Sequence, residues 1–249
     1  MQIMEASVRR SPQSAAPVPQ IRLLGGFEVR WRSSPIRLGS GPQRLLAFLA
    51  LRGGATPRSQ AAGTLWPSTT EELATHSLRS VLWKLRRTGI PMVAADRKQL
   101  ALAPNVEVDF PLVERELRAV VAESMCCSEF DYQRLAPGAD LLPGWDDEWV
   151  VLEREGFRQL RLHALEMLSS QLSKSRRFAA AIEAGRFAVQ IDPLRESASR
   201  AVIDAYIAEG NRIDALRHYE WFRQLLDVEM GLEPSSHIED SMARLATRS

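Results

Sequence analysis

The sequence contains few of the features that build disulfide frameworks, metal centres or membrane spans. Its two cysteines, Cys126 and Cys127, are adjacent, and two are too few for a disulfide framework or a four-ligand zinc site. The longest uninterrupted apolar run, Leu45 to Leu51, has seven residues, whereas a transmembrane helix needs about 20. Residues 1–20 contain no apolar segment and so predict no secretory signal. We therefore expect a soluble, cytoplasmic protein.

Motifs that would indicate an enzyme are also missing. There is no G-x-x-x-x-G-K-[ST] phosphate loop, and Gly25-Gly26 does not begin a G-x-G-x-x-G motif. The four histidines, at 76, 163, 218 and 237, lack metal-ligand spacing and are interpreted as surface or packing residues. The acidic run Asp146-Asp147-Glu148 is interpreted as the capped, charged start of a helix. We expect no enzymatic activity, no cofactor and no metal.

The composition is that of an ordinary globular protein, with 45% apolar and 25% charged residues among 249. The formal net charge is only +1, but the charges are unevenly distributed. Residues 1–104 hold 15 lysines and arginines against 5 acidic residues, whereas residues 105–249 hold 17 against 26. This asymmetry indicates a nucleic-acid or acidic-surface module joined to a module with another partner.

The basic half has the element pattern of a winged helix-turn-helix. Residues 1–20, rich in Ser, Pro, Gln and Ala, predict a disordered tail. In the domain predicted over 21–110, IRLLGGFEVRW reads as strand, turn and strand. Thr56-Pro57 predicts the cap of a second helix, and Ser68 and Glu71 have the spacing of a capping box for a third. The predicted helices cover 43–51, 58–66 and 71–88, and a terminal hairpin pairs 92–94 with 99–102.

The acidic half, 111–249, predicts an all-α domain with no convincing strand. Its expected helices cover 112–125, 148–172, 178–190, 195–208, 213–228 and 236–246. An offset of 34 residues aligns Ala181 with Ala215 and Phe187 with Trp221, which is the period of tetratricopeptide repeats. Such repeats make concave protein-binding surfaces. The aromatic residues are expected in the core or between helices: Trp145, Trp149, Phe157, Phe178, Trp221 and Phe222.

The third predicted helix, 71–88, has one apolar face and one basic face. Its apolar stripe consists of Ala74, Leu78, Val81, Leu82 and Leu85. The opposite face gathers His76, Arg79, Ser80, Trp83 and Arg87, with Lys84 and Arg86 on its flanks. Such a face suits the major groove, where Arg and Ser bond base edges, and the flanking cations suit phosphates. The alternatives are a merely solvated basic face, or a rotated helix in which Trp83 belongs to the core.

Two further groups are candidates for contacts with partners. Arg97 and Lys98 occupy the tip of the predicted hairpin, where they either reach a minor groove or phosphate backbone or remain solvated charges. The segment from Trp66 to Thr70 precedes Glu71 and Glu72. One interpretation is that Trp66 and the two glutamates contact a protein partner. The other is that Trp66 packs inward and the glutamates only favour the helix N-terminus.

Several motifs together resemble the SARP (Streptomyces antibiotic regulatory protein) family of transcriptional activators. They are IRLLGGFEV, PQRLLAFLAL, Leu65-Trp66-Pro67, Leu85-Arg86-Arg87, LLPGWDDEWVVLEREGFRQLRLHALE and ALRHYEWFRQLLDVEMGLEPS, and they extend over about 21–246. The resemblance implies an OmpR-type winged helix followed by a bacterial transcriptional activator domain of tetratricopeptide-like helices. It also implies binding to direct repeats near promoters by two protomers side by side, with recruitment of RNA polymerase at secondary-metabolite genes and a nucleoid-associated location.

On this basis Trp66, Glu71 and Glu72 are predicted to meet a basic patch on a sigma factor of the RNA polymerase holoenzyme. The run before Leu85 departs from the usual family pattern, in which a Thr-His pair precedes Leu-Arg-Arg, so the base preference does not carry over. The competing interpretation is a helical-repeat protein–protein adaptor whose basic N-terminal module binds acidic partners.

Overall fold

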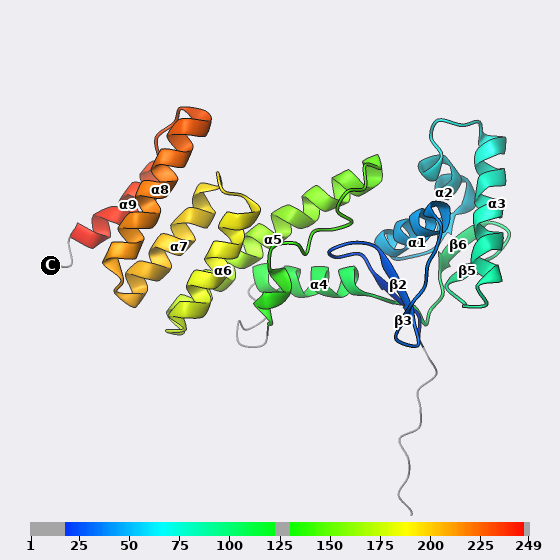
Figure 1. Ribbon diagram of the computed structural model, residues 1–249, viewed down its shortest axis with the longest axis horizontal. Helices are drawn as coiled ribbons and strands as arrows, with labels where there is room; N and C mark the ends of the chain where they lie inside the picture. Colours follow the sequence, from blue (N-terminus) through cyan, green and yellow to red (C-terminus); the bar gives the residue numbers. More distant parts are fainter. Residues whose placement is uncertain (1–17, 123–129, 247–249) are drawn as a thin grey trace, which may run out of the picture. The chain divides into compact units, whose positions relative to one another are not determined.

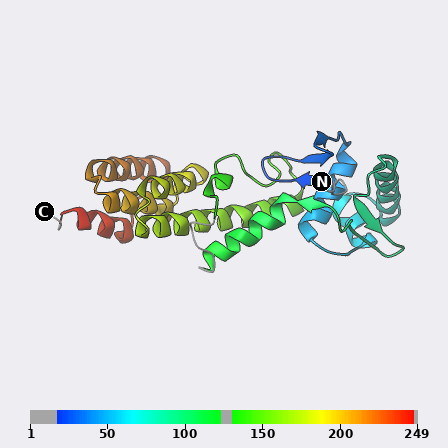
Figure 2. The ribbon, with the colours of Figure 1, turned by 90° about the horizontal axis from the view of Figure 1, so that it is seen from below.

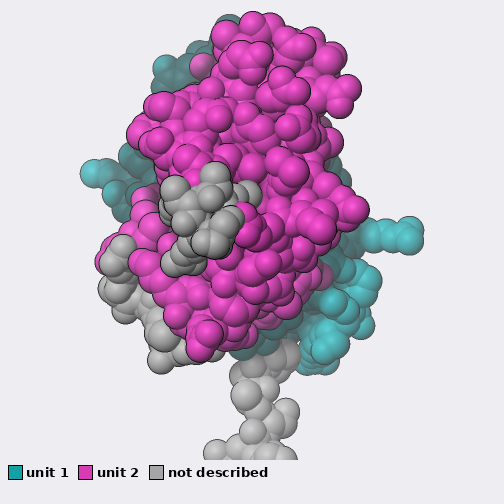
Figure 3. Space-filling view, turned by 90° about the vertical axis from the view of Figure 1, so that its left-hand side faces the viewer, with its two compact units in different colours: residues 1–21, 28–49, 54–107 teal, residues 22–27, 50–53, 108–249 magenta. Residues whose placement is uncertain are grey.

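The computed structural model describes residues 18–122 and 130–246. The predicted tail lies outside this part of the chain apart from 18–20, and Cys126 and Cys127 lie outside it as well. Residue contacts divide the chain into two compact units (Figure 3). The first comprises residues 1–21, 28–49 and 54–107, and the second 22–27, 50–53 and 108–249. Within the described ranges, no helix is long and apolar enough to cross a membrane.

The N-terminal part of the chain has the predicted winged helix-turn-helix fold (Figure 1). Its elements are β1 (Gln20–Arg22), β2 (Glu28–Trp31), β3 (Ser34–Pro35), α1 (Ser40–Arg52), β4 (Thr56–Pro57), α2 (Arg58–Leu65), α3 (Glu71–Arg87), β5 (Val93–Ala95), β6 (Gln99–Leu102) and β7 (Glu107–Val108). The strands form two sheets, in the orders β3-β2-β1-β7 and β4-β6-β5. The apolar run of α1, residues 45–50, is buried and forms part of the core of the first half.

Three of these strands were not predicted. The two-residue strands β3 and β7 are too short to produce an alternating pattern, and β4 was interpreted as a helix cap. Thr56 and Pro57 instead pair with Leu100 and Gln99 of β6, and Thr56 is buried. Pro57 still occupies the cap position of α2, but no side-chain hydrogen bond caps that helix.

Helix α3 begins after Thr70 rather than after the predicted capping box at Ser68. The Thr70 side-chain oxygen accepts a hydrogen bond from the backbone N–H of Leu73 at 3.4 Å. Ser68 lies two positions too early to satisfy the first turn, so that prediction was wrong. Glu71 and Glu72 are in the first turn, where carboxylates interact favourably with the helix dipole.

The C-terminal part is all-helical after β7, as predicted. Its helices are α4 (Asp109–Val121), the short η1 (Tyr132–Leu135), α5 (Glu148–Lys174), α6 (Phe178–Ile191), α7 (Glu196–Glu209), α8 (Arg212–Met230) and α9 (Ser236–Ala246). Helix α6 packs against α5 and α7, α7 also packs against α8, and both α5 and α9 contact α7. Figures 1 and 2 show α6, α7 and α8 side by side in chain order. This is the tetratricopeptide-like stacking that the 34-residue offset indicated.

The aromatic residues of the helical unit divide between its core and its surface. Phe157 and Phe222 are buried, as expected, whereas Trp221 is 43% exposed. Trp221 lies outside the core, because Phe222, its neighbour about 100° around the helix, takes the inward position together with Ala215 and Leu226; it lines the space between α6 and α8 instead. The pair aligned by the repeat offset, Ala181 and Ala215, is fully buried.

Two arginines of α5 hold the segment 135–145 in place. Arg161 is fully buried; its guanidinium donates to Asp140 Oδ1 at 2.7 Å and to the carbonyls of Leu135 and Ala136 at 3.2 Å. About two helical turns earlier, the Arg154 guanidinium donates hydrogen bonds to the carbonyls of residues 141, 142 and 145. The segment fixed in this way pairs with residues 23–25: Gly25 N–H donates to the Asp140 carbonyl and Leu142 N–H to the Leu23 carbonyl.

Gly185 permits the close approach of α6 to its neighbours. A Cβ at this position would lie 2.9 Å from Val202 Cγ2, 3.3 Å from the Val202 backbone nitrogen and 3.4 Å from Ser169 Oγ. Valine is stiff at χ1, and the backbone of α7 has little room to move. Gly156 in α5 offers a contrast, because a Cβ there would meet nothing within 4 Å.

Replacing Gly185 by leucine should destabilise the helical unit by about 2 kcal/mol or more, because overpacking forces helices apart. Gly156→Leu is the matched control; it should be neutral or slightly stabilising, because glycine is a poor helix former. Thermal unfolding of the full chain, followed by far-ultraviolet circular dichroism, measures both variants. Equal unfolding midpoints for the two would show that Gly185 is not needed for helix packing.

Candidate nucleic-acid interface

Helix α3 presents the two faces that its sequence predicts. The five residues of the apolar stripe are the buried residues of the helix: Ala74, Leu78, Val81, Leu82 and Leu85. On the opposite side His76, Arg79, Trp83 and Arg87 are exposed and Ser80 is half-buried; these five residues are the outer face of α3. Lys84 and Arg86 are also exposed. The alternative of a rotated helix is excluded, because Trp83 is 57% exposed.

The charges of this surface are not neutralised by neighbouring carboxylates. Among the described residues, none of Arg79, Lys84 and Arg86 takes part in an ion pair or a side-chain hydrogen bond. The guanidinium of Arg87 lies over the Trp83 ring, 4.6 Å from its centroid. This cation–π contact orders the two large side chains and leaves the arginine charge in place.

The hairpin of β5 and β6 forms the wing beside α3. Its strands pair Val93 with Leu102 and Ala95 with Leu100. The turn is closed by Asp96, whose carboxylate accepts hydrogen bonds from the backbone N–H groups of Lys98 at 2.6 Å and Gln99 at 2.7 Å. The bonds from Gln99 and Lys98 lower the pKa of Asp96 below its ordinary value.

The tip of the wing carries the two predicted cations. Arg97 and Lys98 are both exposed. The base of the turn is held by Arg58, a residue that the sequence reasoning missed: its guanidinium donates to the Asp96 carbonyl at 2.9 Å, and its backbone N–H donates to the Lys98 carbonyl at 2.9 Å. No local signal identifies Arg58, because its partners are about 40 residues away in the chain.

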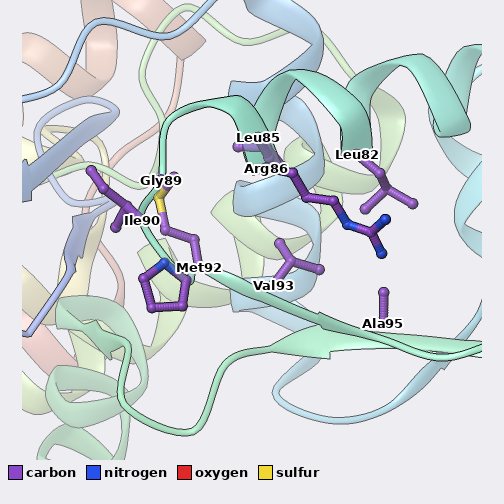
Figure 4. Close-up of a pocket in the computed structure, with 9 residues that line it drawn as sticks. Leu82, Leu85, Arg86, Gly89, Ile90, Met92, Val93 and Ala95 are labelled. Atoms are coloured by element: carbon purple, nitrogen blue, oxygen red, sulfur yellow. The ribbon is translucent and has the colours of Figure 1, made fainter.

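A cavity of about 300 Å³ separates the end of α3 from the wing. Its walls are apolar except for Arg86, and they include Leu82, Leu85, Ile90, Met92 and Val93. Figure 4 shows the Arg86 guanidinium extended between Leu82 of α3 and the strand that contains Val93 and Ala95. An unpaired cation held between helix and wing is positioned for an anion that approaches both elements, as a phosphate backbone does.

The loop between α2 and α3 is a compact turn. Thr69 donates from its hydroxyl to the Trp66 carbonyl at 3.0 Å, and its backbone N–H reaches the same oxygen at 3.3 Å. Trp66 is half-buried and lines a cavity with Gln60, Gly63 and Glu71, whereas Glu71 and Glu72 are exposed. The tryptophan therefore packs partly inward, while both carboxylates face solvent.

No cluster of three or more metal-ligating side chains is present among residues 18–122 and 130–246. His76, His163 and His237 are exposed, and His218 is partly buried on α8.

Two comparisons with known proteins agree with this architecture. Residues 138–245 match the bacterial transcriptional activator domain family. Among solved structures, Mycobacterium tuberculosis EmbR, in a complex with a low-affinity phosphopeptide, superposes with a TM-score of 0.71 at 18% sequence identity. The match covers 94% of this chain and 66% of that one, so the chain spans about two thirds of EmbR. No curated protein matches the sequence.

The chain therefore combines a winged helix-turn-helix fold in its N-terminal part with a region, residues 138–245, that is similar to bacterial transcriptional activator domains. Both findings agree with the resemblance to SARP-type activators that the sequence motifs indicated.

Proposed function

We propose that this regulator binds promoter DNA through α3 and the wing and activates transcription by recruiting RNA polymerase, with no enzymatic activity of its own. The observation that carries the proposal is the outer face of α3, where cations with no carboxylate partner among the described residues surround an exposed tryptophan. A face used only for solvation would not need a large ring 57% exposed to water.

The proposed contacts differ in the part of the DNA that they bind, either base edges or phosphates. Arg79 lies in the middle of the outer face, where a guanidinium can donate two hydrogen bonds to guanine, and Ser80 and His76 are beside it. Lys84 and Arg86 lie on the flanks of this face and suit phosphates. Arg97 and Lys98 at the wing tip provide further positive charge for the adjacent groove or backbone.

The proposal extends to how the protein assembles on DNA. Its resemblance to SARP activators supports binding to direct repeats by two protomers side by side, at promoters of secondary-metabolite genes. The polymerase contact is assigned to the loop at Trp66 with Glu71 and Glu72. The exposure of both glutamates supports this assignment, because they are available to a basic patch on a sigma factor.

The competing function, a helical-repeat adaptor with a basic module, is distinguished by its response to salt. A sequence-specific DNA-binding protein loses affinity steeply as salt rises, while its preference for the cognate site over random DNA persists. An adaptor has no such preference. Binding of genomic fragments selected by the protein, compared with scrambled fragments at several salt concentrations, decides between the two.

Arg79→Ala should relax the choice of one base pair by about 1–3 kcal/mol, because it removes a bidentate base contact. Lys84→Ala should instead weaken binding to all sequences alike. It should also reduce the slope of log binding constant against log salt concentration by about one. Fluorescence anisotropy with cognate and point-mutated sites measures both variants. If Arg79→Ala weakened cognate and random DNA by the same factor, Arg79 would be a phosphate contact.

The double substitution Glu71→Lys with Glu72→Lys should leave DNA affinity intact or improve it, because it adds positive charge, and should abolish activated transcription. In vitro transcription at matched DNA occupancy measures the effect. Glu209→Lys with Glu229→Lys makes the same change in net charge in the helical unit and serves as the control. If the loop variant activated transcription in proportion to its DNA occupancy, the polymerase contacts would lie elsewhere in the chain.

A further inference from the structure

A second cavity, of about 430 Å³, lies within the helical unit between α6, α7 and α8. Arg186 and Gln190 from α6 face Arg217, His218 and Trp221 from α8, and Tyr206 of α7 joins them. Asp214 of α8 also lines the cavity, and with it the four α8 residues follow the i, i+3, i+4, i+7 spacing of a helix stripe that normally packs against its neighbour with apolar side chains. Here the stripe is polar and aromatic, and it surrounds open space.

His218 contributes an unsatisfied polar atom to this cavity. Its Nε2 is buried and has no hydrogen-bond partner in the described part of the chain. Burial, and to a lesser extent the nearby positive charge of Arg186, lower the pKa of His218 to about 4. The ring is therefore neutral at pH 7, and as the Nε2–H tautomer it is a donor in need of an acceptor. Buried polar atoms are normally paired, so this one suggests a missing partner.

Trp221 provides a flat surface in the same place. Its ring is 43% exposed and lies 5.1 Å from the His218 ring, with an angle of 39° between the planes. An exposed indole beside an open cavity is available for stacking by another aromatic ring, an arrangement that stabilises aromatic pairs beyond the area they bury.

The cavity also has an uncompensated positive charge. Arg217 is paired with Asp214 at 3.1 Å. Arg186 is exposed and, within the described ranges, has no carboxylate partner. Arg186 and His218 line the same cavity, so an anion bound there has both side chains around it.

We propose that the cavity between α6 and α8 binds an aromatic carboxylate, with its ring stacked on Trp221, its carboxylate paired with Arg186 and one oxygen accepting a hydrogen bond from His218 Nε2. A volume of about 430 Å³ is near the lower end of ligand pockets in proteins, which suits a small molecule of one or two rings. The site is separate from the nucleic-acid interface and does not depend on its assignment.

The test uses the full chain and 2-naphthoate as the probe. Of the six tryptophan indole N–H signals in a ¹H–¹⁵N spectrum, the one that Trp221→Phe removes should shift on titration. 2-Naphthalenemethanol, which lacks the charge, and cyclohexanecarboxylate, which lacks the ring, should each bind at least tenfold more weakly. Arg186→Gln should weaken 2-naphthoate at least tenfold, whereas Arg223→Gln, which removes an exposed arginine paired with Glu220 on α8, should not.

A peptide that ends in phenylalanine with a free carboxyl group carries the same chemistry and is the second probe. Tighter binding of 2-naphthoate than of the peptide supports a small-molecule ligand. Tighter binding of the peptide would show that the ligand is a protein C-terminus instead. An unmoved Trp221 signal, equal affinity for the uncharged analogue, or full affinity in Arg186→Gln would overturn the site itself.

Discussion

The buried guanidinium of Arg161 is the constraint on which much of the second unit depends. A charge taken out of water is tolerated only when it is paired and hydrogen-bonded, and Arg161 finds these partners in Asp140 and in the carbonyls of Leu135 and Ala136. Burial lowers the pKa of Arg161, and the Asp140 carboxylate opposes that shift. Its Nε is buried without a hydrogen-bond partner among the described residues, so the contacts of the two terminal nitrogens with residues 135, 136 and 140 hold this turn in its path.

The turn also holds a segment from the N-terminal part of the sequence by hydrogen bonds. Residues 23–25 bond to residues 140–142, and the Asp109 carboxylate accepts the backbone N–H groups of Leu23 at 2.8 Å and Leu24 at 3.2 Å. Gly25 has a positive φ of 76° and lies close to the Gly138 carbonyl, so a side chain would be strained there. Gly25 is therefore required by a contact far along the chain as well as by its own turn, whereas Gly26 is required only by its backbone conformation, with a φ of 134°.

Sequence periodicity predicted the features that are local and missed those that depend on distant partners. The buried and exposed faces of α3 follow from its 3.6-residue period alone, and so do the α-helices of the second half, whereas the four-residue η1 was not predicted. The strand at Thr56-Pro57 and the support of the wing by Arg58 depend on residues near 96–100, which no local pattern identifies. Trp221 is exposed because it lies one residue, about 100° around α8, from Phe222, which takes the inward position.

The assignment of residues 22–27 to the second unit has a consequence for synthesis on the ribosome. This segment emerges early, between β1 and β2, but its partners at 140–142 follow more than 100 residues later. At about 5–20 residues per second, the nascent chain holds these backbone groups in water for roughly 10 seconds. The second unit therefore completes its hydrogen bonding only after residues 140–142 have left the exit tunnel, although one of its segments is among the first 27 residues made.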